Sequence, residues 1–494
     1  MAGTMDDSGQ ERGTARDDAR ARGTGAETPA RGAEGGVALA LLVAGTFFME
    51  NLDATVITPA IPAMAESFAV APVDLNTGIS AYMLTVGVFI PISGWAAERF
   101  GARPVFSFAI VLFTLASLLC ALANSLPVFV ASRVLQGIGG ALMVPVGRLV
   151  VLRATPKERL ITAIATLTWP ALVAPVLGPP LGGWVVQHAD WRWIFYLNLP
   201  LGVIALGLAL RIVPATGPNR GARFDWPGFL LLGGALFCLM LVAEMLARPD
   251  AEMAAAAGLA VLGIGLLAWS VRHLNRASHP MFDLSALRLR SFAVTIWGGS
   301  LFRMGVSAVP FLVPLLYQIA FGFDPFDAGL MLMAVFAGNL AMKPMTTWVL
   351  RTFGFRRVLI GNGLLNACAI ASIAFLGADT PLWISCAVLF IGGMSRSMQF
   401  TALNSIAFAD VPDGGMTSAN TLFSTAFQLA MGLGVALGAI AWRLGEVIGA
   451  DAGPVMPFRV AFLIVGAISL LGVLDSLALE AEAGSNVARR ATRR

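Results

Sequence analysis

Charged residues are scarce in this sequence. Only 13% of its 494 residues are Asp, Glu, Lys or Arg, and 57% are hydrophobic, whereas about a quarter of the residues in a soluble domain carry charge. The basic residues lie mostly in short loops and the formal net charge is only +4, which argues against a nucleic-acid-binding surface. The composition excludes a soluble globular domain and indicates a protein built into a lipid bilayer.

Histidine and cysteine are rarer still, with three and four residues respectively. No two cysteines form a CxxC pair and the histidines lack ligand spacing, so we expect no metal, no cofactor and inert cysteines inside the helices. These residues are His188, His273, His279, Cys120, Cys238, Cys368 and Cys386.

Motifs for ATP binding and for catalysis are also missing. No Walker A motif, HExxH pair or Ser/His arrangement occurs, which argues against an ATP-driven pump and leaves a membrane-embedded enzyme as a distant alternative. If such a membrane protein moves a solute, an ion gradient then remains as the energy source. Carboxylates within the hydrophobic runs make the proton the expected coupling ion.

Long hydrophobic runs dominate what is present. A helix needs roughly 20 apolar residues to cross a hydrocarbon core about 30 Å thick, and runs of this kind recur along the chain. We predict fourteen spans near residues 36–59, 78–97, 104–123, 127–151, 161–186, 194–214, 227–247, 254–272, 292–318, 327–350, 357–377, 381–407, 417–442 and 457–478.

The basic residues orient these spans, because loops rich in Arg and Lys stay on the cytoplasmic side. One alternating set of loops begins with Arg99 and Arg103 and is basic throughout, whereas the other contains little beyond Arg192 and Arg248. An even number of spans then places both Arg-rich termini inside. We predict a multi-pass protein of the inner (cytoplasmic) membrane with cytoplasmic termini.

An internal repeat indicates how the spans are grouped. Phe-Gly-Ala-Arg at 100–103 matches Phe-Gly-Phe-Arg at 353–356, an offset of 253 residues, and the R-x-x-Q pattern of 133–136 recurs at 396–399. Duplicated bundles with two helices inserted between them explain both matches. The predicted organisation is a disordered cytoplasmic tail (1–35), an N-terminal six-helix bundle (36–214), two additional membrane helices (225–272), a C-terminal six-helix bundle (290–478) and a basic cytoplasmic tail (479–494).

Several segments resemble a known family. Gly-Trp-Ala-Ala-Glu-Arg-Phe-Gly-Ala-Arg-Pro at 94–104 resembles the G-x-L-a-D-R-x-G-R-[KR] element of the major facilitator superfamily, with Glu98 replacing Asp and Ala96 replacing Leu. Gly-Pro-Pro-Leu-Gly-Gly at 178–183 resembles the G-P-x-x-G-G motif of its exporters, and Trp-Arg-Trp-Ile-Phe-Tyr-Leu-Asn-Leu-Pro-Leu-Gly at 191–202 is similar to a segment of the fourteen-span drug:proton antiporters of the EmrB/QacA type. Leu-Asp-Ala-Thr-Val at 52–56 resembles the L-D-x-T-[IV] element of the same branch.

This resemblance covers nearly the whole chain after the N-terminal tail. It implies an all-α integral membrane fold of fourteen helices, in which two six-helix bundles and two linker helices form the major facilitator fold. It also implies export of small, lipophilic organic compounds in exchange for protons by alternating access. An uptake symporter is the closer alternative function.

Gating roles are expected for two of these segments. The loop 94–104 would act as a cytoplasmic latch in which Arg103 and Glu98 contact neighbouring helix ends, and the alternative is a solvated basic turn. Prolines and small residues at 170–183 would make a bending, tightly packed helix that serves as hinge and seal, and the alternative is ordinary helix packing. The predicted gating residues are Glu98, Arg99, Gly101, Arg103, Arg133, Gln136, Gly178, Pro179, Gly182 and Gly183.

Charged residues inside the predicted spans are candidates for the transport pathway, because each costs at least about 2.5 to 3.5 kcal/mol to insert. They are Glu50, Asp53, Arg133, Glu244, Arg303, Lys343 and Arg396. Lys343 and Arg396, together with Gln399, are candidate cavity residues, and the alternative for the two cations is a buried ion pair or carbonyl contact.

Glu50 and Asp53 are the candidate proton-coupling residues. They are three residues apart and share one face of a helix, and two close carboxylates at low dielectric disfavour double ionisation. The offset of 253 residues makes Arg303 equivalent to Glu50, so we expect Arg303 to be the basic partner across the cavity. The alternative is that Asp53 only hydrogen-bonds neighbouring helices.

The expected partners follow from this function. They are a small organic substrate, cationic or neutral, together with protons and the lipid bilayer. A periplasmic adaptor with an outer-membrane channel is left open as a further partner.

Overall fold

The computed structural model describes residues 29–484 apart from 71, 216, 218, 220, 222, 248–251, 324, 450–452 and 481. Every regular element in this described part is a helix. Helices are what a lipid environment requires, because a helix satisfies its own backbone donors and acceptors where no water is present. The all-helical membrane fold predicted from the sequence is confirmed.

The helices follow the predicted spans closely. The first half contains α2 (Pro29–Val56), α3 (Ile61–Phe68), α4 (Asn76–Phe89), α5 (Ile92–Phe100), α6 (Ala102–Leu122), α7 (Leu126–Ala154), α8 (Leu160–His188), α9 (Trp193–Tyr196) and α10 (Asn198–Ile212). The middle contains α11 (Trp226–Ala247) and α12 (Met253–Leu274). The second half contains α13 (Arg290–Leu315), extended by a π-helical turn (Leu316–Ala320), and then α14 (Pro325–Ala341), α15 (Lys343–Phe353), α16 (Phe355–Ile373), α17 (Leu382–Ile406), α18 (Met416–Ile448) and α19 (Met456–Leu477).

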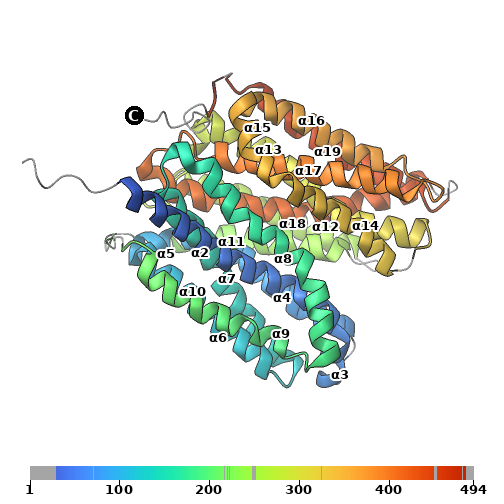
Figure 1. The fold of residues 1–494 in the computed structure, drawn as a ribbon, viewed down its shortest axis with the longest axis horizontal. Coiled ribbons are helices and arrows are strands. Elements are labelled where there is room, and N and C mark those ends of the chain that lie inside the picture. The colour runs from blue at the N-terminus through green and yellow to red at the C-terminus, as the bar shows by residue number, and fades with distance from the viewer. Residues whose placement is uncertain are drawn as a thin grey trace, which may run out of the picture.

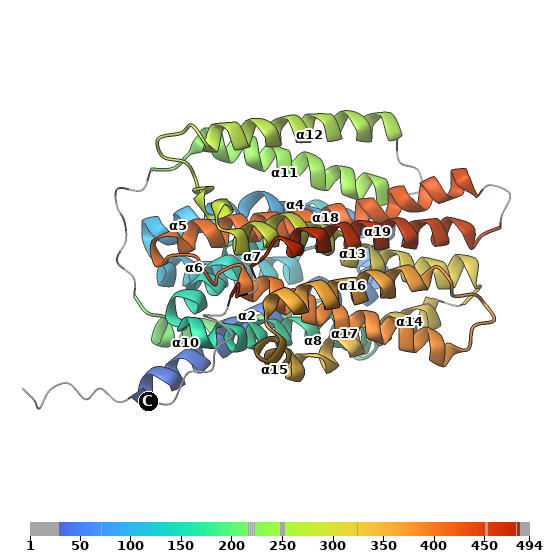
Figure 2. The ribbon, with the colours of Figure 1, turned by 90° about the horizontal axis from the view of Figure 1, so that it is seen from above.

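Two helical bundles lie side by side, and their helices run roughly along the same axis (Figure 1). In the first bundle α2 packs on α8 and α10, and α7 packs on α4 and α6. In the second, α13 packs on α18 and α19, α16 on α17 and α19, and α14 on α17. Helix α11 contacts α4 of one bundle and α18 of the other, and α12 packs on α11 at one side of the molecule (Figure 2).

The second span of each bundle is broken at an equivalent place. Helices α4 and α5 meet at 59°, and α14 and α15 meet at 51°. Pro91 precedes α5 and Pro344 lies in the first turn of α15, positions that are 253 residues apart in the sequence. Proline lacks a backbone N–H and fits a helix start. The repeat therefore fixes the position of this bend in both bundles.

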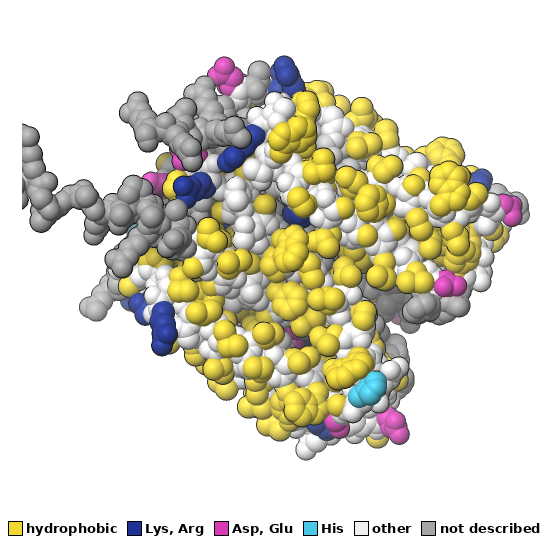
Figure 3. Space-filling model, in the orientation of Figure 1, with side chains coloured by type: hydrophobic (Ala, Val, Ile, Leu, Met, Phe, Trp, Pro, Cys, Tyr) yellow, Lys and Arg dark blue, Asp and Glu magenta, His cyan; other side chains and the backbone are white. Residues whose placement is uncertain are grey.

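The surface of the molecule fits a bilayer. Hydrophobic side chains cover the middle of the face in Figure 3, and charged side chains gather toward its two ends. Length and hydropathy identify eleven described helices as candidate spans, or thirteen if each bent pair is one span. Helix α17 matches the one remaining predicted span, 381–407, but its buried face carries many Ser, Thr, Asn and Gln residues. The count of fourteen therefore stays a prediction.

Three details differ from the sequence-based prediction. Helix α2 begins at Pro29, so part of the predicted disordered tail is helical, while residues 1–28 lie outside the described part. The predicted basic tail begins with packed chain, since Leu479 is buried, and residues 485–494 are again outside the described part. Cys368 is exposed on α16 rather than buried in the helix core, because its side of the helix faces outward.

Candidate transport site

A cavity of about 310 Å³ lies between the two bundles. Helices α2, α4, α7 and α8 line it from one bundle, and α14, α15, α17 and α18 line it from the other. Much of the wall is apolar, with aromatic side chains from both bundles at Phe47, Phe336, Phe400 and Phe427. A concave, largely apolar site with a few polar groups is the usual form of a small-molecule site.

Glu50 is the acidic side chain in the described lining of this cavity. It extends from α2 toward α7, where a methyl group added to Gly140 would lie 3.3 Å from the Glu50 carboxylate and 3.2 Å from the Tyr82 hydroxyl. The Glu50 Oε2 atom has no hydrogen-bond partner among the described residues, and no salt bridge joins Glu50 to a described cation. The carboxyl group therefore has no described cation partner and one oxygen atom open to a proton or a ligand, with the Tyr82 hydroxyl beside it.

Three cations line the same cavity. Arg148 comes from α7, Lys343 from α15 and Arg396 from α17. Lys343 is only 6% exposed and donates to the Thr401 hydroxyl at 3.1 Å. Arg148 and Arg396 each have guanidinium nitrogens without a partner among the described residues. Sequence reasoning missed Arg148, although it lies within a predicted span and could have been found as one more intramembrane charge.

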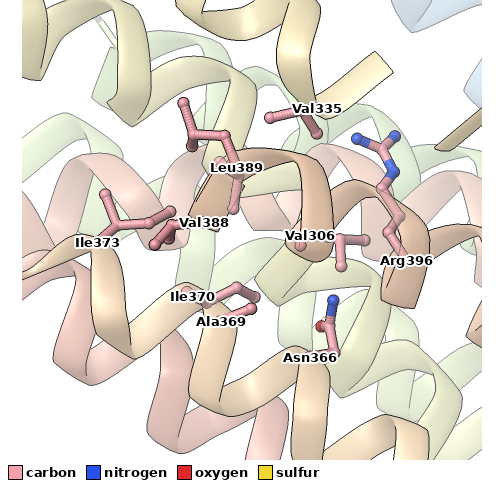
Figure 4. Close-up of a pocket in the computed structure, with 11 residues that line it drawn as sticks. Val306, Val335, Asn366, Ala369, Ile370, Ile373, Val388, Leu389 and Arg396 are labelled. Carbon is pink, nitrogen blue, oxygen red and sulfur yellow. The ribbon is translucent and has the colours of Figure 1, made fainter. Parts of the chain in front are cut away.

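Arg396 also borders a small apolar pocket inside the second bundle. Figure 4 shows its guanidinium directed away from the aliphatic side chains of Ile370, Ile373 and Val388. Helix α17 thus carries Arg396 at a boundary, with the central cavity on one side and this pocket on the other. Its sequence neighbour in the R-x-x-Q pattern, Gln399, does not line the central cavity and instead donates to the Leu359 carbonyl at 3.0 Å.

Asp53 lies one turn after Glu50 in a completely different environment. Its carboxylate is enclosed within the first bundle, where Arg133 Nη1 approaches Oδ2 at 2.6 Å and both side chains are 0% exposed. Gln136 and Asn198 donate to Oδ1 at 2.8 Å and 2.7 Å. Arg133 and Gln136, which the sequence predicted as gating residues, therefore bind the carboxylate of Asp53. Asp53 was predicted together with Glu50 as a proton-coupling residue.

The polar network around Asp53 extends over five helices. Gln136 and Asn198 also donate to the Ser117 hydroxyl on α6, at 2.8 Å and 3.2 Å, and the Arg133 guanidinium lies 4.4 Å from the centroid of the Tyr82 ring on α4. Arg133 Nε and Nη2 have no partner among the described residues, but the hydrogen bonds centred on Asp53 join the helices of this bundle. The roles of Ser117 and Tyr82 were missed, because the sequence around them carries no motif.

Arg303 is not placed opposite Glu50 as a direct partner. It is 0% exposed and donates to the Thr295 carbonyl at 2.8 Å within its own helix. Its guanidinium lies 5.0 Å and 5.3 Å from the ring centroids of Phe423 and Phe427. Phe427 belongs to the cavity lining and Arg303 does not, so Arg303 acts on the cavity only through the residues in front of it.

The repeated Phe-Gly-x-Arg loops have matching geometry in the two bundles. Gly101 and Gly354 adopt φ values of 91° and 75°, a region that favours glycine. Arg103 donates to the Leu210 carbonyl near the end of α10, and Arg356 donates to the Leu477 carbonyl at the end of α19, at 3.3 Å. A cation at a helix C-terminus is favourable because carbonyls there lack helical partners.

Glu98 and Arg99, which precede Gly101 in the first of these loops, have different contacts from Arg103. The Glu98 backbone carbonyl accepts a hydrogen bond from the Asn219 amide at 2.9 Å. Arg99 Nη1 is buried without a described partner. The loop thus joins α5, α10 and the segment before α11 at one end of the molecule.

The Gly-Pro-Pro-Leu-Gly-Gly segment brings α8 against the end of α2. A methyl group on Gly178 would lie 2.2 Å from the Thr55 hydroxyl, and one on Gly182 would lie 2.2 Å from the Val56 carbonyl oxygen. Gly183 has no atom within 4 Å of such a methyl group, and the Pro179 side chain lies outside the described residues. The two contacting glycines allow an approach that no larger residue permits.

Hydrogen bonds between the bundles gather toward one end. Among the described residues, Lys157 donates to the Val411 carbonyl and Arg351 to the Glu158 carbonyl, both at 3.3 Å, and Arg153 contacts the Thr417 hydroxyl. This end carries the Phe-Gly-x-Arg loops, whereas the bundles diverge toward the ends of α3 and α14 (Figure 1). The cavity is therefore closed toward the basic end.

Comparisons with known proteins agree with this architecture. Residues 43–435 match the sequence profile of the Major Facilitator Superfamily. This chain belongs to the major facilitator superfamily. A relative from Serratia proteamaculans, provisionally named multidrug resistance protein MdtD, is 39% identical over 399 residues, which cover 81% of this chain and 83% of that protein.

Solved major facilitator structures share the fold at low sequence identity. The human organic anion transporter MFSD10 superposes with a TM-score of 0.65 at 16% identity, covering 89% of this chain and 99% of that one. The proton:xylose symporter XylE gives a TM-score of 0.61 at 15% identity, covering 90% and 95%. The predicted family and the non-enzymatic, transporter character of the chain are confirmed, and the fold alone does not fix the direction of transport.

Proposed function

We propose that this major facilitator protein exports small organic compounds across the cytoplasmic membrane in exchange for protons. The observation that carries the proposal is Glu50, a carboxyl group without a cation partner in a cavity between two bundles. A carboxyl group in such a site changes charge when it binds or loses a proton, and the cost of that charge changes with its surroundings. The multidrug resistance name of the 39% identical relative supports export.

Alternating access would proceed from the arrangement described above. We propose that the basic end is cytoplasmic and that the closed contacts there belong to an outward-facing state, in which substrate leaves and Glu50 takes up a proton. Breaking contacts such as Lys157 to Val411 would then open the cavity inward. Gly178 and Gly182 would let α8 move along α2 while the helices stay in close contact.

Asp53 has a separate task in this proposal. Its carboxylate is already paired with Arg133 and does not line the cavity, so it would orient α2 and hold Glu50 toward the cavity. The proposed proton carrier is therefore Glu50, and Asp53 is a positioning residue. Arg303 would tune the cavity through Phe427 and Asn404, the latter at 3.5 Å.

Deletion and overexpression strains test the proposed export. They would be scored for resistance to a chemically broad set of compounds and for intracellular accumulation of each compound. We expect overexpression to lower accumulation of some compounds, and the Glu50→Gln variant at equal abundance to lose this effect. Unchanged accumulation across the whole set would contradict export.

Further partners remain to be tested in the same cells. Export across a second membrane would require a periplasmic adaptor and an outer-membrane channel, and crosslinking followed by co-purification tests for them. The transport cycle itself involves only this chain, its substrate, protons and the bilayer.

A further inference from the structure

The charges around the central cavity are strongly unequal. Arg148, Lys343 and Arg396 line it with three formal positive charges, and Glu50 supplies one negative charge. The described lining therefore has an excess of two positive charges when Glu50 is ionised and three when it is protonated. This balance disfavours the purely cationic members of the cationic or neutral substrates that the sequence led us to expect.

Two of the three basic groups also have donors without described hydrogen-bond partners. Arg396 has two guanidinium nitrogens, Nε and Nη1, buried without a described hydrogen-bond partner, and Arg148 has one. Buried donors without partners are costly in proteins, and Arg133 and Arg303, which do not line the cavity, have such donors as well. An acidic group on a ligand would satisfy them, because guanidinium groups bind carboxylates with paired hydrogen bonds.

The charges are also divided between the walls. Lys343 and Arg396 lie on α15 and α17 of the second bundle, whereas Glu50 on α2 and Arg148 on α7 lie on the first. Aromatic side chains from both bundles line the space as well, including Phe47, Phe336 and Phe400. A ligand that spans the cavity therefore meets two cations on the wall of the second bundle, aromatic side chains on both walls, and a carboxyl group with one cation on the wall of the first bundle.

Proton exchange adds a further condition. A proton on Glu50 removes the negative charge in the cavity and so strengthens the binding of a simple anion. The proton and the anion would then be bound together and cross the membrane in the same direction. A protonated amine beside Glu50 has the opposite effect, because it favours the ionised carboxylate and displaces the proton. A basic group at Glu50 therefore couples substrate binding to proton release.

We infer that the preferred substrates are amphoteric organic compounds, with an apolar body, an acidic group that binds Lys343 and Arg396, and an amine that replaces the proton on Glu50. This inference rests on the proposed export function. It replaces the cationic or neutral substrate expected from sequence. A volume of about 310 Å³ suits a body of one or two aromatic rings.

Three fluorescent compounds with the same bicyclic body test the inference. Naphthylalanine carries an acid and an amine, naphthylpropionate carries only the acid, and naphthylethylamine carries only the amine. Binding to the purified full chain and proton release into weakly buffered detergent solution are measured for each. We expect naphthylalanine to bind on the order of tenfold more tightly than naphthylethylamine and to release a proton, and naphthylpropionate to bind without proton release.

Variants of Arg396 separate charge from folding. Arg396→Gln should remove most of the preference for naphthylalanine over naphthylethylamine, and Arg396→Lys should restore much of it. Loss of folding in Arg396→Gln would leave the wild-type comparison and the Lys variant as the test. Tighter binding of naphthylethylamine with proton release would overturn the inference but preserve proton-coupled export. Proton release with none of these compounds, and no change in accumulation of any compound in cells, would contradict the export function itself.

Discussion

Glu50 and Asp53, one helical turn apart on α2, lie on opposite sides of a structural boundary. Glu50 borders the cavity between the bundles, and Asp53 is sealed inside the first bundle by Arg133 at 2.6 Å. Two carboxylates that share a helix face in sequence therefore have different chemistry. The neighbours of each carboxylate, drawn from other helices, decide whether it is open to a ligand or already paired.

Breaking the buried pair should destabilise the protein. Asp53→Asn leaves the Arg133 guanidinium buried without a counter-ion, and removing one partner of such a pair costs about 3 to 5 kcal/mol. We expect a clearly lower midpoint of thermal unfolding for the purified variant in detergent. The double variant Asp53→Asn/Arg133→Met should recover part of the loss, because both charges are gone. An unchanged midpoint in Asp53→Asn would contradict a structural role for the pair.

The contact between α8 and α2 gives a prediction with a built-in control. Gly182→Ala would put a methyl group 2.2 Å from the Val56 carbonyl oxygen, whereas Gly183→Ala meets no atom within 4 Å. Overpacking of this kind costs about 1 to 3 kcal/mol and should also hinder movement of α8. We expect lower efflux at equal abundance for Gly182→Ala and Gly182→Val, and wild-type efflux for Gly183→Ala. Equal efflux in all three would remove the role of this segment in gating.

The loop between α5 and α6 predicts a change in transport with little change in stability. Arg103→Gln removes a cation from the carbonyl end of α10, where Arg103 contacts Leu210. Because exposed charge contacts contribute at most about 1 kcal/mol, we expect nearly unchanged thermal stability. Efflux should fall severalfold, since the contact fixes the loop between α5 and α6 against the end of α10 within the first bundle.

Arg211, an exposed basic residue in the last turn of α10, is the matched control for this loop. Arg211→Gln removes one positive charge from the same end of α10 without touching the Arg103 contact, and should leave efflux unchanged. If both variants lost efflux equally, general basicity of this surface, rather than the Arg103 contact, would explain the effect.

The membrane orientation has its own test. Reporter fusions at Gly35 and Gly484 should both indicate the cytoplasm, because the basic loops lie at one end and the number of predicted spans is even. Reporters on opposite sides would mean an odd number of spans, and α17 would be the first helix to reconsider, given its polar buried face.

The sequence predicted the helices and their repeat more fully than the site. Hydrophobic runs are local properties of the chain, so spans such as α6 and α16 could be placed within a few residues. The offset of 253 residues also predicted equivalent positions, including Arg103 and Arg356 at two helix ends. These features depend on residues near in sequence or on duplicated segments.

The side-chain partners could not be predicted in the same way. Arg133 is 80 residues from Asp53, and Asn198 is 145 residues from it, so the pairing depends on the rotation of each helix in the bundle. Glu50 and Arg303 are 253 residues apart, as the repeat requires of equivalent positions. The side chain of Arg303 nevertheless turns toward Thr295 and two aromatic rings. Equivalent backbone positions do not fix where long side chains point.

Proton coupling at Glu50 is measured most directly in everted membrane vesicles that hold an acidic interior. Addition of a compound whose accumulation the protein lowers should release protons from wild-type vesicles and from Glu50→Asp vesicles, which keep the carboxyl group. Glu50→Gln vesicles with equal protein should release none, because their cavity no longer has an acidic group to exchange a proton. Substrate-induced proton release of wild-type size from Glu50→Gln vesicles would contradict the assignment of Glu50 as the proton carrier.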